Sequence, residues 1–132
     1  MITFDDSRWP LVVFESHGAL DDAQFESYLR SYDRVLQRKE RYVVVFDARR
    51  AKPLGVDHVK RHAKWIEHNA SVIGQYNLGV AFVIPSPMIR GVLKAILWLR
   101  PMPQPHVVVD TLAEAVAWTT LKLAGAGMKT PT

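Results

Sequence analysis

The sequence contains no cysteine among its 132 residues. Disulfide bonds, thiolate zinc sites, iron–sulfur clusters and a cysteine nucleophile are therefore excluded. Long apolar runs are also missing: the longest, such as Val43–Phe46 and Ala95–Leu99, fall far short of the roughly 18 residues that span a bilayer. The N-terminus, with Asp5 and Asp6, lacks the basic and apolar regions of a signal peptide, so we expect a cytoplasmic protein.

Common catalytic motifs are absent too, because the sequence has no G-x-S-x-G, P-loop, G-x-G-x-x-G or H-E-x-x-H segment. We therefore expect a non-enzymatic protein without a cofactor. One alternative is an enzyme that uses Asp47, at a strand end where α/β proteins usually bind ligands, together with His58 and His62. These histidines lie four residues apart and could share a metal, but no carboxylate joins their flank, so we expect no metal site.

The residues that are present suit one folded domain: 48% are hydrophobic and 23% are charged. Periodicity predicts an opening hairpin with strands at 2–4 and 10–15 around a turn at 5–8. The further elements expected are helices at 21–36, 57–73, 87–99 and 111–123, strands at 42–47, 78–84 and 107–109, and a loop at 48–55. We expect a single domain over 1–124 and a flexible tail over 125–132.

The element order is thus β-β-α-β-α-β-α-β-α, which predicts an α/β fold with a mixed, mostly parallel sheet. Local signals support the helix ends: Asp21 with Gln24 matches a capping box, Ser86 precedes Pro87 at a helix start, and Thr111 can cap the last helix. Gly74 is expected to end the second helix.

Several segments resemble the STAS domain of anti-sigma-factor antagonists, and more closely a STAS-like, lipid-binding-type branch of small bacterial proteins. They are Val12-Val13-Phe14 before Gly18, Val43–Asp47, Ala81–Ile84 before Arg90, and a last strand followed by 113–118. The resemblance implies a protein-interaction or regulatory module that is switched by phosphorylation of a Ser or Thr after the third strand. The corresponding loop here, 48–55, has no Ser, Thr or Tyr, so we expect that switch to be missing.

The helix at 87–99 carries only two charged residues, Arg90 and Lys94. One apolar stripe, expected to face the sheet, consists of Met88, Val92, Ala95, Ile96 and Leu99. A second stripe, Ile89, Leu93 and Leu97, with Trp98 on the other flank, widens the apolar arc beyond what one sheet covers. Neighbouring helices could cover this second stripe. Otherwise it is a partner interface, and we expect a homodimer or a contact with another protein.

Charge is unevenly spread within the net +4: residues 1–47 carry 6 Lys/Arg and 9 Asp/Glu, whereas residues 48–132 carry 11 and 4. Arg49, Arg50, Lys60 and Lys64 could form a patch for an anion or an acidic partner. No nucleic-acid motif accompanies them, so we expect a solvated surface and no nucleic-acid partner. A further alternative is a carrier or sensor of a small apolar or lipid-like ligand, with a candidate pocket at Asp47, His58, His62, Trp65 and Ser86.

Overall fold

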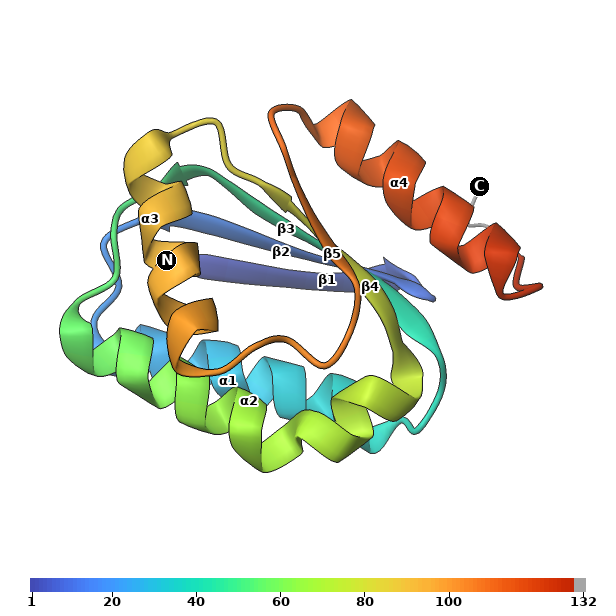
Figure 1. The fold of residues 1–132 in the computed structure, drawn as a ribbon, viewed down its shortest axis with the longest axis horizontal. Coiled ribbons are helices and arrows are strands. Elements are labelled where there is room, and N and C mark those ends of the chain that lie inside the picture. Colours follow the sequence, from blue (N-terminus) through green and yellow to red (C-terminus); the bar gives the residue numbers. More distant parts are fainter. Residues whose placement is uncertain (130–132) are drawn as a thin grey trace.

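The computed structural model describes residues 1–129, which form one five-stranded sheet and four helices (Figure 1). The strands are β1 (Ile2–Arg8), β2 (Leu11–Gly18), β3 (Tyr42–Ala51), β4 (Asn77–Val83) and β5 (His106–Val109). The helices are α1 (Asp22–Gln37), α2 (Val56–Tyr76), α3 (Pro87–Leu99) and α4 (Leu112–Gly125). The strand order is β1-β2-β3-β4-β5, with β1 and β2 antiparallel and every other pair parallel. The predicted fold class is confirmed.

The sheet is covered unequally on its two faces. Helices α1, α2 and α3 lie over one face and α4 alone lies over the other (Figure 1). Strand β3 is buried on both: Tyr42 and Val44 pack on the side of α1–α3, and Val43 and Val45 pack on the side of α4. A strand buried on both faces has no polar alternation, which explains the continuous apolar run that predicted it.

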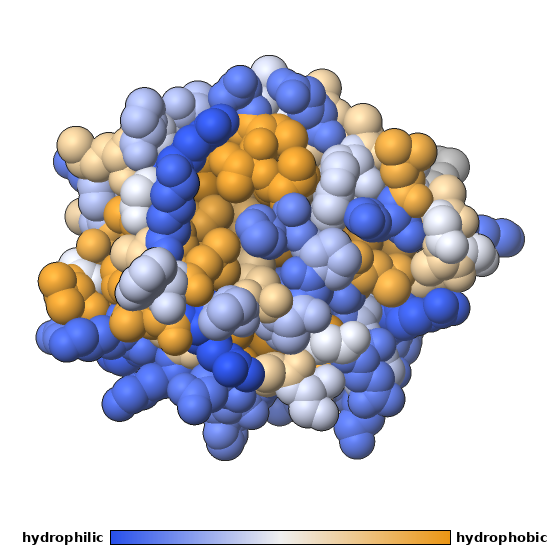
Figure 2. Space-filling model, viewed as in Figure 1, coloured by the Kyte–Doolittle hydropathy of each residue, from blue (hydrophilic) through white to orange (hydrophobic). Residues whose placement is uncertain are grey.

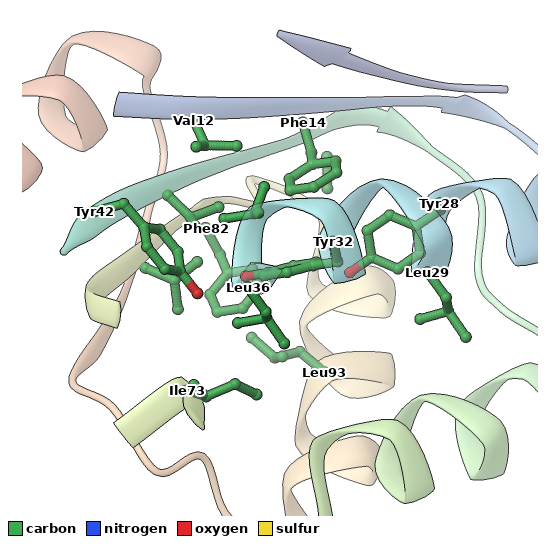
Figure 3. Close-up of a cluster of buried hydrophobic side chains, with 14 of the residues drawn as sticks. Val12, Phe14, Tyr28, Leu29, Tyr32, Leu36, Tyr42, Ile73, Phe82 and Leu93 are labelled. Carbon is green, nitrogen blue, oxygen red and sulfur yellow. The ribbon is translucent and has the colours of Figure 1, made fainter. Parts of the chain in front are cut away.

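An aromatic cluster joins α1 to the sheet (Figure 3). The ring of Phe14 stacks on Tyr32 with centroids 4.9 Å apart and meets Tyr28 edge-on at 5.3 Å. Phe14 is fully buried, and Tyr28 and Tyr32 expose less than a tenth of their surface. Helix α1 contributes to this cluster from one face, because its buried residues recur at helical spacing, as Tyr28, Tyr32 and Val35 show.

The predicted helix starts are confirmed. Gln24 N–H donates to the Asp21 carboxylate at 2.7 Å, and Asp21 N–H donates to the Gln24 side chain at 3.1 Å, which completes the capping box. The Ser86 hydroxyl accepts from Ile89 N–H at the start of α3, and the Thr111 hydroxyl accepts from Glu114 N–H at the start of α4.

The expected hairpin turn at 5–8 is wrong, since β1 continues to Arg8 and the chain reverses at Trp9 and Pro10. The polar residues that suggested a turn form an irregularity in the edge strand instead, where Ser7 N–H donates to the Asp5 carboxylate at 2.8 Å. Edge strands commonly carry such charged bulges.

Two further boundaries differ from the sequence prediction. Strand β3 extends through Ala51, into the segment predicted as a loop, because β2 offers it a partner: Arg50 pairs with His17 and Ala51 with Gly18. Helix α2 continues past Gly74 to Tyr76. Gly74 lies beside Pro103 in the segment that follows α3, and a Cβ there would make an ordinary contact at 3.8 Å, so no packing constraint requires glycine at this position.

The buried faces of α3 and α4 also differ from expectation. On α3 the buried residues are Ile89, Leu93 and Ile96, whereas Met88 and Leu99, expected to face the sheet, are exposed. Helix α3 packs beside α2. Its buried side is therefore rotated about the helix axis from the side that would be buried if only the sheet covered it.

On α4 the sequence pattern predicts an inner side of Leu112, Ala115, Val116, Thr119 and Leu121. The structure buries Ala115, Thr119 and Leu123, while Leu112 and Leu121 are exposed. Thr119 is accommodated because its hydroxyl donates to the Ala115 carbonyl at 3.0 Å. Beyond α4, Met128 N–H donates to the Leu123 carbonyl at 3.0 Å, and residues 130–132 of the expected tail lie outside the described residues.

The contact between α4 and the sheet depends on Gly79, whose Cα faces the Trp118 ring. An added Cβ would stand 2.6 Å from that ring. We predict that Gly79→Ala destabilises the domain by about 1–3 kcal/mol through overpacking. Gly91→Ala, on an open face of α3 with nothing within 4 Å, should instead stabilise it by about 0.5–1 kcal/mol. Urea unfolding of both variants checks this, and equal effects would contradict the packing of Trp118.

Candidate functional site

A cavity of about 100 Å³ lies between the sheet and helices α1, α2 and α3. Its walls come from all of these elements and from the segment between α3 and β5, and they are mainly apolar. The aromatic members include Phe25, Phe46, Trp65 and Phe82. Figure 2 shows apolar side chains at the surface over α3 and in the hollow beside it.

Two polar side chains in the cavity wall contact each other, although Nδ1 of His62 is buried without a hydrogen-bond partner within residues 1–129. The Tyr28 hydroxyl and Nε2 of His62 lie 2.8 Å apart, in hydrogen-bond contact. Burial raises the pKa of Tyr28 above its usual range and lowers the pKa of His62 to about 4. Both groups are therefore neutral at pH 7, and this part of the wall carries no charge.

Contacts between α1 and α2 hold these two helices in place beside the cavity. The His58 ring stacks on Phe25 at 4.4 Å, and His58 Nε2 contacts the Asp22 carboxylate at 2.7 Å. Trp65 lies one turn from His62 and donates from Nε1 to the Asp33 carboxylate at 2.9 Å. These links run between α1 and α2, so they fix the distance between the two helices.

The pocket predicted from the sequence is only partly assembled. His62 and Trp65 line the cavity, but Asp47, His58 and Ser86 do not. Ser86 caps α3, and His58 points toward Asp22. Strand alternation places Asp47 with Val43 and Val45 on the face of α4, away from the histidines. Asp47 and the two histidines therefore do not form one site.

Asp47 is buried but already has a partner. Arg49 donates to both carboxylate oxygens, at 2.9 and 2.7 Å. Burial by itself raises the pKa of Asp47, yet the hydrogen bonds and charge of Arg49 outweigh it and hold that pKa below its ordinary value. The pair is a bidentate ion pair, so Arg49 is not available to an external anion without breaking it.

The four basic residues of the predicted patch do not share one surface. Arg49 lies on the α4 side of the sheet with Asp47, whereas Lys60 and Lys64 lie on α2, over the opposite face. Arg50 is exposed near the end of β3. These residues are close in the sequence, but they belong to a strand and a helix that present them on different sides of the molecule.

The predicted partner interface is divided between core and surface. Ile89 and Leu93 belong to the core and Leu97 packs against it, so these residues do not form an exposed stripe. Trp98, by contrast, is 88% exposed. Met88 and Leu99, predicted to face the sheet, lie on the outer side of α3 with Trp98, at 69% and 53% exposure.

Most of the cavity lining is absent from the pocket predicted from the sequence, including the polar residues Ser16, Lys52 and Gln104. Ser16 carried a usable signal, because it continues the inward alternation of Val12 and Phe14 along β2. Lys52 and Gln104 come from irregular segments, and no periodicity in the sequence marks them.

The structure describes residues 1–129. In that range no group of three or more His, Asp or Glu residues is placed to hold a metal ion. None of the four helices described has the length and apolarity needed to cross a bilayer.

Comparisons with known proteins bear on the fold. No protein-family model and no curated protein matches the sequence. Among solved structures, an uncharacterized protein of the DUF3478 family with a SpoIIAA-like fold, from Shewanella loihica PV-4, is similar with a TM-score of 0.66 and 15% identity, over 90% of this chain and 92% of that one.

Two anti-sigma factor antagonists are also similar. One is SpoIIAA in its unphosphorylated form, with a TM-score of 0.59 and 16% identity over 89% of this chain and 96% of that one. The other, from Mycobacterium paratuberculosis, has a TM-score of 0.58 and 17% identity over 90% and 92%. The chain therefore has the STAS-like fold that its sequence pattern resembled.

The buried neutral histidine has a consequence for stability. His62 has a pKa of about 4 in the folded protein and an ordinary value near 6.5 when unfolded, so the unfolded chain binds more protons between these values. The free energy of unfolding should fall by on the order of 3 kcal/mol as the pH drops from about 6.5 to 4. His62→Gln should remove this part of the pH dependence in urea titrations, whereas His68→Gln, exposed on the same helix, should keep it. An unchanged profile in His62→Gln would contradict the burial of that ring.

Proposed function

We propose that the protein is a non-catalytic interaction module, and that it docks a protein partner through the outer face of α3. The observation that carries this proposal is Trp98, a tryptophan exposed to 88% on a helix that has few charges. Tryptophan is the residue most enriched at the energetic centres of protein interfaces. The STAS-like fold supports a regulatory or interaction role, since solved proteins of that fold include anti-sigma factor antagonists.

The exposed face of α3 is a stripe and not a single residue. Met88, Gly91, Ala95 and Trp98 recur at helical spacing along it, and Leu99 adjoins Trp98. Single exposed apolar residues are normal, but a contiguous apolar stripe is typical of a contact surface. Figure 2 shows apolar side chains at the surface over this helix.

The charges beside this stripe indicate the partner's chemistry. All charged residues from Pro87 to Arg100 are basic: Arg90, Lys94 and Arg100. Arg90 is held by Asp110 at 2.8 Å, which leaves Lys94 exposed on the helix. A partner with acidic residues around an apolar patch would complement this face. The homodimer expected from the sequence stays a prediction, and it would bring the two copies' basic residues together.

Substitution of the stripe tests the proposal. Trp98→Asp should leave the fold and the unfolding free energy nearly unchanged, because the side chain is exposed, and should abolish partner binding. The matched control is Leu121→Asp, which changes a 71% exposed leucine on α4 and should leave binding intact.

Two measurements read out these variants. Light scattering on the wild type at high concentration tests the homodimer. Affinity capture from the host with the wild type and both variants, quantified by mass spectrometry, identifies partners that Trp98→Asp loses and Leu121→Asp retains. Partners bound equally by all three proteins would contradict the proposed face.

We also propose that the module works without phosphorylation after its third strand. Residues 48–55 lack Ser, Thr and Tyr, and half of that segment forms the end of β3. After incubation with host kinases, mass spectrometry should find no phosphate in this segment. Stoichiometric phosphorylation of Ser86 or Thr111 that alters partner binding would show instead that the switch has moved to a helix cap.

A second candidate function, carriage or sensing of a small apolar molecule, is favoured by one observation. The cavity under α3 has mainly apolar walls, and the polar pair in that wall, Tyr28 and His62, is neutral at pH 7. Buried apolar cavities of this kind stay dry and take up small apolar molecules.

A further inference from the structure

We propose that the cavity under α3 binds a short aliphatic carboxylate, with its hydrocarbon chain inside and its carboxylate beside Lys52 and Ser16. The proposal rests on the second candidate function, carriage or sensing of an apolar molecule, and adds the charge and orientation of the ligand. It is independent of the docking face on α3.

The charge distribution around the cavity selects an anion. Within residues 1–129, Lys52 is the only charged residue that lines it, and no Asp or Glu of that range does. Within residues 1–129 Lys52 forms no ion pair. Lys52 is therefore an exposed cation at the margin of an apolar space, an arrangement that favours a ligand with one negative end.

A serine lies at the same end of the cavity. Ser16 is only 5% exposed, shares the inward face of β2 with Phe14, and lines the cavity. Its hydroxyl makes no hydrogen bond within the described part of the chain. A ligand carboxylate would accept from that hydroxyl, which supplies a second contact of the right polarity.

The backbone holds Ser16 and Lys52 near each other. Strand β2 ends at Gly18, which pairs with Ala51 at the end of β3. Lys52 N–H then donates to the Gly18 carbonyl at 3.3 Å. Gly18 has a φ of +63°, a conformation that glycine adopts without strain, so the chain can turn here while keeping that contact. Both residues thus lie at the carboxyl ends of adjacent parallel strands, where α/β proteins usually bind ligands.

The other end of the cavity carries no charge. Gln104 lines it there, next to Pro105, whose carbonyl accepts from Val80 N–H near the beginning of β4. The Gln104 amide is neutral, and Leu93 and Phe82 from α3 and β4 also line the cavity. A bound chain is therefore oriented with its charged end at Lys52 and its methyl end toward the interior.

The volume sets the length of the chain. A dry cavity of about 150 Å³ accommodates benzene in another protein, which is six carbon atoms. The present cavity, about 100 Å³, is smaller, and Lys52 is an exposed residue of its lining. A chain of roughly four to six carbons fits, part of it inside and the carboxylate beside Lys52.

Three probes of equal chain length separate charge from apolarity: hexanoate, 1-hexanol and hexylammonium. Binding is measured by NMR titration of the uniformly 15N-labelled protein, followed at the Trp65 indole N–H. We expect hexanoate to bind at least tenfold more tightly than hexylammonium, with hexanol between them. Hexanoate binding should weaken as salt is added.

Variants then locate the site. Lys52→Gln should abolish the preference for hexanoate over hexanol while hexanol still binds, whereas Lys64→Gln, on the outer face of α2, should change neither. Val92→Phe should fill the cavity and abolish binding of all three probes. Its control is Ala95→Phe, on the exposed side of the same helix, which should bind as the wild type does.

The outcomes distinguish the inference from the function on which it rests. Binding of hexanol without any preference for hexanoate, or a preference that survives Lys52→Gln, would overturn the carboxylate assignment and leave the apolar carrier intact. No binding of any probe to the wild type at millimolar concentration would overturn both. Circular dichroism of each variant confirms that the loss of binding is not loss of the fold.

Discussion

Burial of β3 on both faces is the constraint from which the rest of the molecule follows. A strand that presents Val43 and Val45 on one side and Tyr42 and Val44 on the other must be covered twice. The right-handed crossovers supply three helices to one side and leave α4 for the other. Gly79 permits Trp118 to lie directly on the sheet, so the α4 side is closed tightly.

The side with three helices is packed differently. Aromatic rings from α1 fill the space next to β2 and β3, and α2 is joined to α1 through His62, His58 and Trp65. Helix α3 lies beside α2 and contributes Ile89, Leu93 and Ile96 to the walls of the cavity, so its opposite side, with Trp98, faces outward. Helix α3 therefore carries both features that suggest function: its outer face is apolar, and its inner face lines the cavity.

What the sequence could predict depended on the range of the interactions involved. Helix caps at Asp21, Ser86 and Thr111 are set by residues three positions apart, and they were predictable. The end of β3 depends on pairing with His17 and Gly18, more than thirty residues away, and its polar composition pointed to a loop. The inward face of α3 depends on α2, so the sequence left open whether neighbouring helices cover the stripe containing Ile89 and Leu93 or whether it is a partner interface, and the structure places both residues in the core.

The candidate site shows the same limit. His62 and Trp65 were predictable because both lie on one amphipathic helix, but Asp47 was grouped with them although strand alternation turns it to the opposite face. Ser16, Lys52 and Gln104 come from three separate parts of the chain, and only the assembled sheet and helices bring them to one cavity. Charge at one end of an apolar space is a property of the fold and is not visible in local patterns.

The most direct test of this account is a crystal structure of the protein soaked with 5-bromopentanoate, whose bromine is located by its anomalous scattering. The account predicts bromine inside the cavity near Phe82 and Leu93, with the carboxylate at hydrogen-bond distance from Lys52. Bromine found only on the molecular surface, or a reversed ligand with its carboxylate next to Gln104, would contradict it.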